Sequence, residues 1–198
     1  METEENYRFL YKLISTIQKD ILPKTHKGVL AGNKIFGAAI LLKSDFSLVV
    51  ADTNNEIENP LFHGEVSCLN SFFRKSEQFN IKELLFISTH EPCSMCLSAI
   101  TWAGFNNIYY FFSHQESRDN FNIPHDLKIL KEVFDIDPGQ YKKKNAFWSC
   151  KSIIDLVTNL NDKNSEILIE KISNIKGEYE KLSESYQNRK ILNRIPLK

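Results

Sequence analysis

Two stretches decide how this chain of 198 residues folds: "NPLFHGEVSCL" at 59–69 and "STHEPCSMCLSAI" at 88–100. The first places His63 and Glu65 two residues apart, and the second places Cys93 and Cys96 three residues apart. Imidazole and thiolate groups are ligands of zinc in proteins, but neither stretch has enough of them to hold a metal alone. The two stretches therefore form a metal site only if the fold brings them together.

The rest of the chain predicts a sheet flanked by helices. Helices are expected where apolar side chains recur at three- and four-residue steps. These segments are 5–20, 64–77, 93–104, 126–134 and 149–160. Strands are expected where short apolar runs lie between turn residues. These are 35–43, 47–52, 83–89 and 107–112. Because strands alternate with helices after an initial hairpin, we predict a three-layer α/β/α sandwich built on a mixed sheet.

The composition changes near residue 161, where Lys, Glu, Asn and Ser become frequent. An apolar stripe at three- and four-residue steps predicts one long helix, which docks on its own domain or on a sister subunit. The stripe consists of Leu168, Ile172, Ile175, Tyr179 and Leu182. We therefore expect a domain over residues 1–160 and a C-terminal helical extension over residues 161–198.

The composition disfavours some classes of partner. Lys and Arg number 25, as do Asp and Glu, so the chain lacks the basic excess that is common in nucleic-acid-binding domains. The start, "METEENYRFL", lacks the layout of a secretory signal. No apolar run reaches the ~18 residues that a membrane span needs. We expect a soluble, cytoplasmic protein without a membrane partner, in which a Cys-x-x-Cys pair indicates metal or redox chemistry.

The candidate ligands all fall where helices are expected to begin. His63 and Glu65 lie at the start of 64–77, where side chains at i and i+2 can lean toward one point. Cys93 and Cys96 lie on one face in the first turn of 93–104, after Pro92, where the helix dipole lowers thiol pKa values. Three ligands without a fourth are typical of a catalytic zinc site, which keeps one position for water.

The remaining cysteines do not offer a fourth ligand. Cys68 lies on the same helix as His63 but faces away from it by a large angle, and Cys150 is a candidate core residue. The rival interpretation of the cysteine pair is a redox dithiol, which would require neither His63 nor Glu65.

The joint pattern H-x-E followed by P-C-x-x-C is the signature of zinc-dependent nucleobase deaminases. From about Phe36 to Phe121 the chain resembles the cytidine deaminase-like superfamily, which includes nucleoside, cytosine and guanine deaminases and tRNA adenosine deaminases. The resemblance implies a five-stranded sheet and one zinc ion per chain, bound by His63, Cys93 and Cys96. Zinc would lower the pKa of its bound water toward ~7. Glu65 would take the proton of this water, protonate the ring nitrogen next to the attacked carbon, and then deliver a proton to the departing amine.

The resemblance also implies substrate contacts. The backbone N–H of Gly64 and the backbone carbonyl of Glu91 occupy places where family members hold the polar edge of the base. Asn54 corresponds to an asparagine that orients the substrate, with Asn55 as the alternative. Three further candidates are the aromatic walls Phe36 and Trp102 and the acidic Asp119.

The choice of substrate rests on competing resemblances. "PCSMCLSAITWAGFNNIYY" is similar to guanine deaminases, whereas "HGE" is similar to fungal-type cytosine deaminases. "NNIYYFFSHQESRDNF" has little of the basic charge that an RNA backbone requires. We predict hydrolytic deamination of a small nucleobase or nucleoside by a homodimer, because family members commonly form dimers. The alternatives are tRNA adenosine deamination and a non-catalytic zinc-bound scaffold, against which the intact Glu65 argues.

Overall fold

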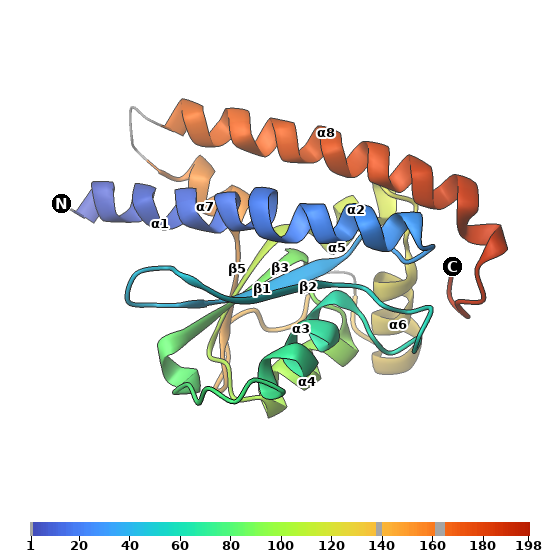
Figure 1. Cartoon of the computed structure of the whole chain (residues 1–198), viewed down its shortest axis with the longest axis horizontal. Helices are drawn as coiled ribbons and strands as arrows, with labels where there is room; N and C mark the ends of the chain where they lie inside the picture. The colour runs from blue at the N-terminus through green and yellow to red at the C-terminus, as the bar shows by residue number, and fades with distance from the viewer. Residues whose placement is uncertain (1, 138–139, 161–164) are drawn as a thin grey trace.

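The structure is a computed structural model that describes residues 2–137, 140–160 and 165–198. Its centre is one mixed sheet of five strands in the order β2-β1-β3-β4-β5 (Figure 1). The strands are β1 (Gly37–Leu42), β2 (Leu48–Thr53), β3 (Leu84–His90), β4 (Asn107–Phe112) and β5 (Ser149–Ser152). β1 pairs antiparallel with β2 and β3, whereas β3, β4 and β5 run parallel. The predicted mixed five-stranded sheet is confirmed.

Helices cover both faces of the sheet. One face packs against α1 (Glu2–Thr16), the π-helical turn η1 (Ile17–Ile21), α2 (Leu22–Leu30), α7 (Ile153–Thr158) and α8 (Ser165–Arg189). The other packs against α3 (Gly64–Phe73) and α4 (Ser94–Trp102). Every residue of the central strand β3 is buried, as expected for a strand covered on both faces. The result is the predicted three-layer sandwich.

The first helical segment is longer than the sequence pattern indicates. The predicted helix ends at residue 20, but the helical path continues through η1 and α2 to Leu30. Apolar positions continue to face the core at Ile21, Leu22 and Val29. Pro23 falls in the first turn of α2, where its missing N–H removes little from the helical hydrogen bonding.

The predicted helix over 149–160 is partly wrong. Residues Ser149–Ser152 form β5, which pairs with β4, and only Ile153–Thr158 are helical. A strand of four residues is too short to show a two-residue period. The Ser152 side chain accepts a hydrogen bond from the Asp155 N–H, which fixes the change from strand to helix.

Two short helices lie between β4 and β5. α5 (His114–Asp119) begins with a capping box at Ser113 and Glu116, and α6 (His125–Phe134) overlaps the predicted helix over 126–134. Two 3-10 turns, η2 (Ile81–Glu83) and η3 (Lys190–Leu192), complete the elements of the described residues. Within the described ranges, none of the helices combines the length and the apolar character needed to cross a membrane.

The long helix α8 lies beside α1 and α2 (Figure 1). All five residues of its predicted apolar stripe are buried, and they belong to the same core cluster as one face of the sheet. The stripe therefore packs within the chain. The predicted boundary between residues 160 and 161 adjoins residues 161–164, which lie outside the described residues, so the division into two parts stays a prediction.

Candidate active site

The loop that ends at His63 and the loop that ends at Cys93 each lead directly into a helix at one end of the sheet. His63 immediately precedes α3, and Cys93 immediately precedes α4. The Cys93 sulfur accepts a hydrogen bond from the Cys96 N–H at 3.5 Å, so it caps the helix that carries both thiols. Pro92 therefore lies just before the cap and not inside the first turn.

The three predicted metal ligands meet. His63 Nδ1 lies 3.6 Å from Cys93 Sγ and 3.7 Å from Cys96 Sγ, and the three ligand atoms lie within 4.8 Å of one another. Ligands bound at ~2.0–2.3 Å around one tetrahedral zinc ion are separated by roughly 3.5–3.8 Å. The geometry and the chemistry of this donor set therefore fit zinc. Cys68 and Cys150 are buried in the hydrophobic core.

The groups of the cluster shift one another's pKa values. Hydrogen bonds to the Cys93 sulfur hold the pKa of that thiol well below its usual value, while burial raises the pKa of Cys96 well above it. Burial opposes protonation of His63, but the hydrogen bond and negative charge of Cys93 raise its pKa to about 9. Metal binding would displace these protons, because zinc binds thiolate and neutral imidazole.

Glu65 lies directly beside the thiols. Its side chain is 4% exposed, and its pKa is raised by burial. Ser88 Oγ donates to Oε1 at 3.0 Å, and Cys96 Sγ donates to Oε2 at 3.3 Å. The carboxyl group is thus fixed next to the metal donors, as a proton carrier at this site would have to be.

A cavity leads from the metal ligands toward the surface. A small space of about 10 Å³ lies at the ligands, bordered by Phe36, Glu65, Glu91 and Asp126, and a larger cavity of about 340 Å³ adjoins it. The larger cavity is within the usual size range of small-molecule sites. Its lining consists of Lys34, Phe36, Glu56, Pro60, Leu61, His63, Cys93, Ser94, Met95, Ile123, His125, Asp126, Ile129, Ile195, Pro196 and Leu197.

Several of these lining residues were not predicted. Asp126, in the first turn of α6, borders both spaces, and burial and the negative charge of Cys93 raise its pKa to about 7. Its position at the start of the predicted helix 126–134 indicated a helix start, but not a place beside the metal ligands. Ile195 comes from the C-terminal tail and is 4% exposed. Nothing in the local sequence indicates that the tail reaches this cavity.

The predicted substrate contacts divide into two groups. Phe36 borders both spaces, and Glu91 borders the smaller one. Asn54 and Gly64 lie next to the site but line neither space. The Gly64 N–H donates a hydrogen bond to Asn54 Oδ1. Asn54 Nδ2 donates to Glu56 Oε2 at 2.8 Å, so both polar atoms of this amide bind protein groups. The alternative, Asn55, hydrogen-bonds Glu58.

Two residues predicted to contact the substrate lie away from the cavity within the single chain. Trp102 is 91% exposed at the last residue of α4, which is about 12 Å along the helix from its first residue. Asp119 is exposed and forms an ion pair with the neighbouring Arg118 at 2.6 Å. Neither residue lines the cavity, because α4 and α5 direct these positions away from it.

Comparisons with known proteins agree with this geometry. Residues 20–112 match the family model described as "Cytidine and deoxycytidylate deaminase zinc-binding region". A guanine deaminase of Bacillus subtilis (strain 168) is 28% identical over 101 residues, which cover 50% of this chain and 62% of that protein. A tRNA-specific adenosine deaminase of Rickettsia typhi is 29% identical over 76 residues, which cover 37% of this chain and 51% of that protein. The chain thus spans less than two thirds of either relative.

The fold is similar to that of a solved structure. The X-ray structure of guanine deaminase from Bacillus subtilis has a TM-score of 0.51 at 23% identity, covering 67% of this chain and 80% of that one. At this identity the likeness supports the fold alone. The matched zinc-binding region, the sheet topology and the cluster of His63, Cys93 and Cys96 place the chain in the cytidine deaminase-like superfamily of zinc-dependent deaminases.

Proposed function

We propose that the protein is a hydrolase of cyclic amidines that deaminates a nucleobase or nucleoside of the guanine or cytosine type and releases ammonia. The observation that carries this proposal is the position of Glu65. Its carboxyl group, 3.3 Å from Cys96 Sγ, is buried beside three zinc ligands. It borders the small space at these ligands, which adjoins a cavity large enough for a base. A scaffold held by zinc would need neither the buried acid nor the cavity.

Glu65 has the properties that the proton transfers require. Zinc bound to the three ligands supplies Lewis-acid activation of water. Glu65 accepts a proton from the attacking water and passes it to the ring nitrogen beside the attacked carbon. It then carries the second proton to the leaving amine, so that water and amino-base become oxo-base and ammonia. Ser88 fixes the carboxyl group during these transfers through its 3.0 Å hydrogen bond.

The charges of the larger cavity favour a neutral substrate. Lys34 lines the cavity, but Glu56 neutralises it at 2.6 Å. His125 has a pKa lowered by burial, so its imidazole is neutral at pH 7. A phosphate in the cavity would therefore meet no unpaired cation among the described lining residues. These features favour a free base or nucleoside over a nucleotide.

Asp126 is the polar group best placed to select among such substrates. Its carboxyl group borders both spaces, and no described side chain hydrogen-bonds it. With a pKa of about 7 it can present either an O–H donor or an acceptor near neutral pH. Phe36 provides an apolar wall against which a planar base can stack.

The test is an ammonia-release assay of the zinc-loaded protein against bases, nucleosides and mononucleotides. We expect turnover of a base or nucleoside, and a kcat lower by about 10²–10⁴-fold for a Glu65→Gln variant that still binds one zinc ion per chain. One zinc per chain with no ammonia release from any compound would favour the scaffold alternative. Turnover of mononucleotides alone would contradict the argument from the cavity charges.

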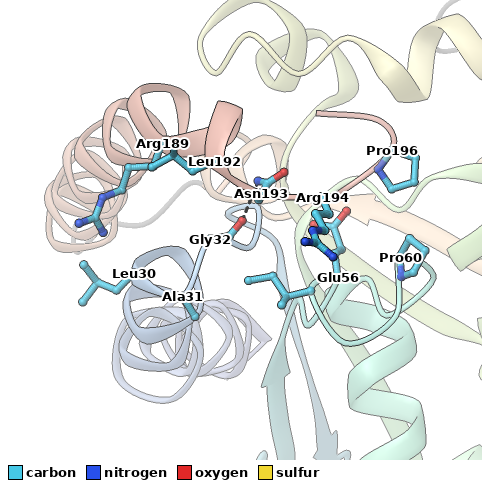
Figure 2. Close-up of a pocket in the computed structure, with 11 residues that line it drawn as sticks. Leu30, Ala31, Gly32, Glu56, Pro60, Arg189, Leu192, Asn193, Arg194 and Pro196 are labelled. Carbon is cyan, nitrogen blue, oxygen red and sulfur yellow. Dashed lines mark hydrogen bonds between the residues drawn. The ribbon is translucent and has the colours of Figure 1, made fainter.

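A second candidate, tRNA adenosine deamination, is favoured by a different observation. A cavity of about 500 Å³ lies next to the candidate catalytic cavity and shares Glu56, Pro60 and Pro196 with it. Figure 2 shows Arg189, from the end of α8, and Arg194, from the C-terminal tail, among its lining residues. Both arginines are exposed. Exposed arginines beside a base-sized cavity are suited to an RNA backbone.

This candidate is tested with an anticodon stem-loop that contains adenosine. Inosine formation that falls steeply with salt, and that is lost in an Arg189→Ala/Arg194→Ala variant, would support it. The matched control is Arg74→Ala, an arginine at the end of α3. If wild type forms no inosine, and the double variant and wild type are equally active on free bases, the first candidate stays in place.

A further inference from the structure

A second carboxylate lies on the far side of the His63 ring from the thiols. Glu56 Oε1 is 3.8 Å from His63 Nε2, while His63 Nδ1 faces Cys93 and Cys96. We propose that Glu56 is a positioning residue of the metal centre, which orients His63 through Nε2 and keeps Nδ1 free to bind the metal. The inference rests on the zinc centre of the proposed function, but not on the identity of the substrate.

The chemistry of imidazole gives this contact its effect. A neutral ring carries one proton, so a ring that binds metal through Nδ1 has its proton on Nε2. A carboxylate near Nε2 stabilises that form and restricts rotation of the ring. The separation of 3.8 Å is an ion-pair distance, longer than a hydrogen bond.

Glu56 is itself held rigidly. Its side chain is 1% exposed, and Lys34 Nζ lies 2.6 Å from Oε1. The Lys34 backbone N–H donates to Oε2 at 3.2 Å, and Asn54 Nδ2 donates to the same oxygen at 2.8 Å. A buried carboxylate requires such partners, because desolvation without them is costly. The donors fix the direction in which the remaining face of the carboxylate points, which is toward His63.

The same network reaches the start of α3. Asn54 connects Glu56 to the Gly64 N–H, and Gly64 directly follows His63. One network of contacts therefore positions both parts of His63: Asn54 holds the backbone at Gly64, and Glu56 approaches the ring. The residues of this network come from the two ends of the β1–β2 hairpin. Lys34 precedes β1, and Asn54 and Glu56 follow β2. An ordinary ion pair between Lys34 and Glu56 would need neither the amide link nor the approach to the imidazole.

The experiment measures zinc affinity by competition with a chelator of known affinity. Glu56→Gln should weaken zinc binding by about 10–100-fold. Because this change leaves Lys34 buried without a counter-charge, a Lys34→Met/Glu56→Gln double variant is made in parallel to keep the fold, and it should lose as much affinity. Lys34→Met alone keeps the carboxylate and should change the affinity by no more than about threefold. Glu58→Gln, an exposed glutamate of the same loop, is the matched control.

A direct measurement on the unaltered protein completes the test. Nitrogen NMR of the zinc-loaded chain should show the His63 proton on Nε2, slow to exchange, and exchange should accelerate in the double variant. Unchanged zinc affinity in the double variant would overturn the inference. An equal loss of affinity in Lys34→Met would overturn it too, since the pair would then act only through the fold. A protein with these zinc affinities but without deaminase activity would refute the proposed function and leave the inference intact.

Discussion

Two buried glutamates adjoin the candidate metal centre, and they are held by different parts of the chain. Glu56, on the His63 side, binds Lys34 from the segment before β1. Glu91, two residues before Cys93, accepts hydrogen bonds from Tyr141 at 2.6 Å and from the His114 N–H at 3.1 Å, and it pairs with Lys143 at 2.8 Å. One half of the centre is thus supported by the β1–β2 hairpin, and the other by residues that follow β4.

The two carboxylates differ in the groups that they contact. Glu56 approaches the side chain of a metal ligand, whereas all the partners of Glu91 belong to the surrounding scaffold. Lys34 is also more deeply enclosed: its side chain is 5% exposed, against 38% for Lys143. Loss of the Glu56 carboxylate should therefore change metal binding, whereas loss of the Glu91 carboxylate should change mainly stability.

The largest effect is expected at Glu65, which lies between the two halves and contacts neither carboxylate network. Glu65→Gln should lower kcat by about 10²–10⁴-fold, the usual contribution of a general acid-base group. Zinc content measured on the same samples should equal that of wild type. A variant that loses zinc together with activity would show that Glu65 acts on the ligands and would remove the contrast with Glu56.

The next largest effect distinguishes the two lysines. Lys34→Met leaves a carboxylate that is 1% exposed without its cation, so we expect a loss of about 3–5 kcal/mol in the free energy of unfolding. Lys143→Met should cost about 1.5–3 kcal/mol, because Tyr141 and the His114 N–H still bind Glu91. Urea unfolding of the metal-free proteins measures both, with the exposed Lys24→Met as control. Equal losses would show that the two networks are equivalent.

These comparisons also explain how far the sequence could predict the site. His63, Glu65, Cys93 and Cys96 were predictable because each pair is close in sequence and begins a helix, so local spacing fixes their relative positions. Lys34, Glu56 and Asp126 were not, since a single charged residue shows no period, and only the packing of distant segments places the three on one cavity. Trp102 lies outside the cavity for a related reason: it was predicted from a resemblance to a motif, but the length of α4 places it far from the ligands.

A smaller effect is expected at Gly64, on the His63 side. A Cβ at this position would lie 2.6 Å from Gly37 Cα and 2.8 Å from Gly37 N, so β1 would have to move. Gly64→Ala should therefore destabilise the protein by about 1–3 kcal/mol and weaken zinc binding, because His63 precedes the displaced residue. Gly177→Ala in α8 is the control, with open space around it and an expected gain of about 0.5–1 kcal/mol. Thermal unfolding with and without zinc compares the two.

The smallest effect is expected from the C-terminal tail, which borders the cavity without joining either network. Asn193 Nδ2 donates to Gly32 O at 3.0 Å, and this bond, dashed in Figure 2, anchors the tail beside the His63 loop. Beyond it, Ile195 is 4% exposed and contributes an apolar wall to the cavity. Removal of residues 194–198 should therefore affect the substrate and spare the metal.

We expect the truncation to raise KM by about tenfold, because the loss of one apolar wall should weaken the free energy of substrate binding by about 1.4 kcal/mol. Zinc affinity should be unchanged, since Glu56 keeps Lys34, Asn54 and His63 as neighbours. Removal of Lys198 alone is the control, because this exposed residue lines neither cavity. Weaker zinc binding after truncation would mean that the tail supports the His63 side of the centre, and the contrast between the two carboxylates would then depend on a third segment of the chain.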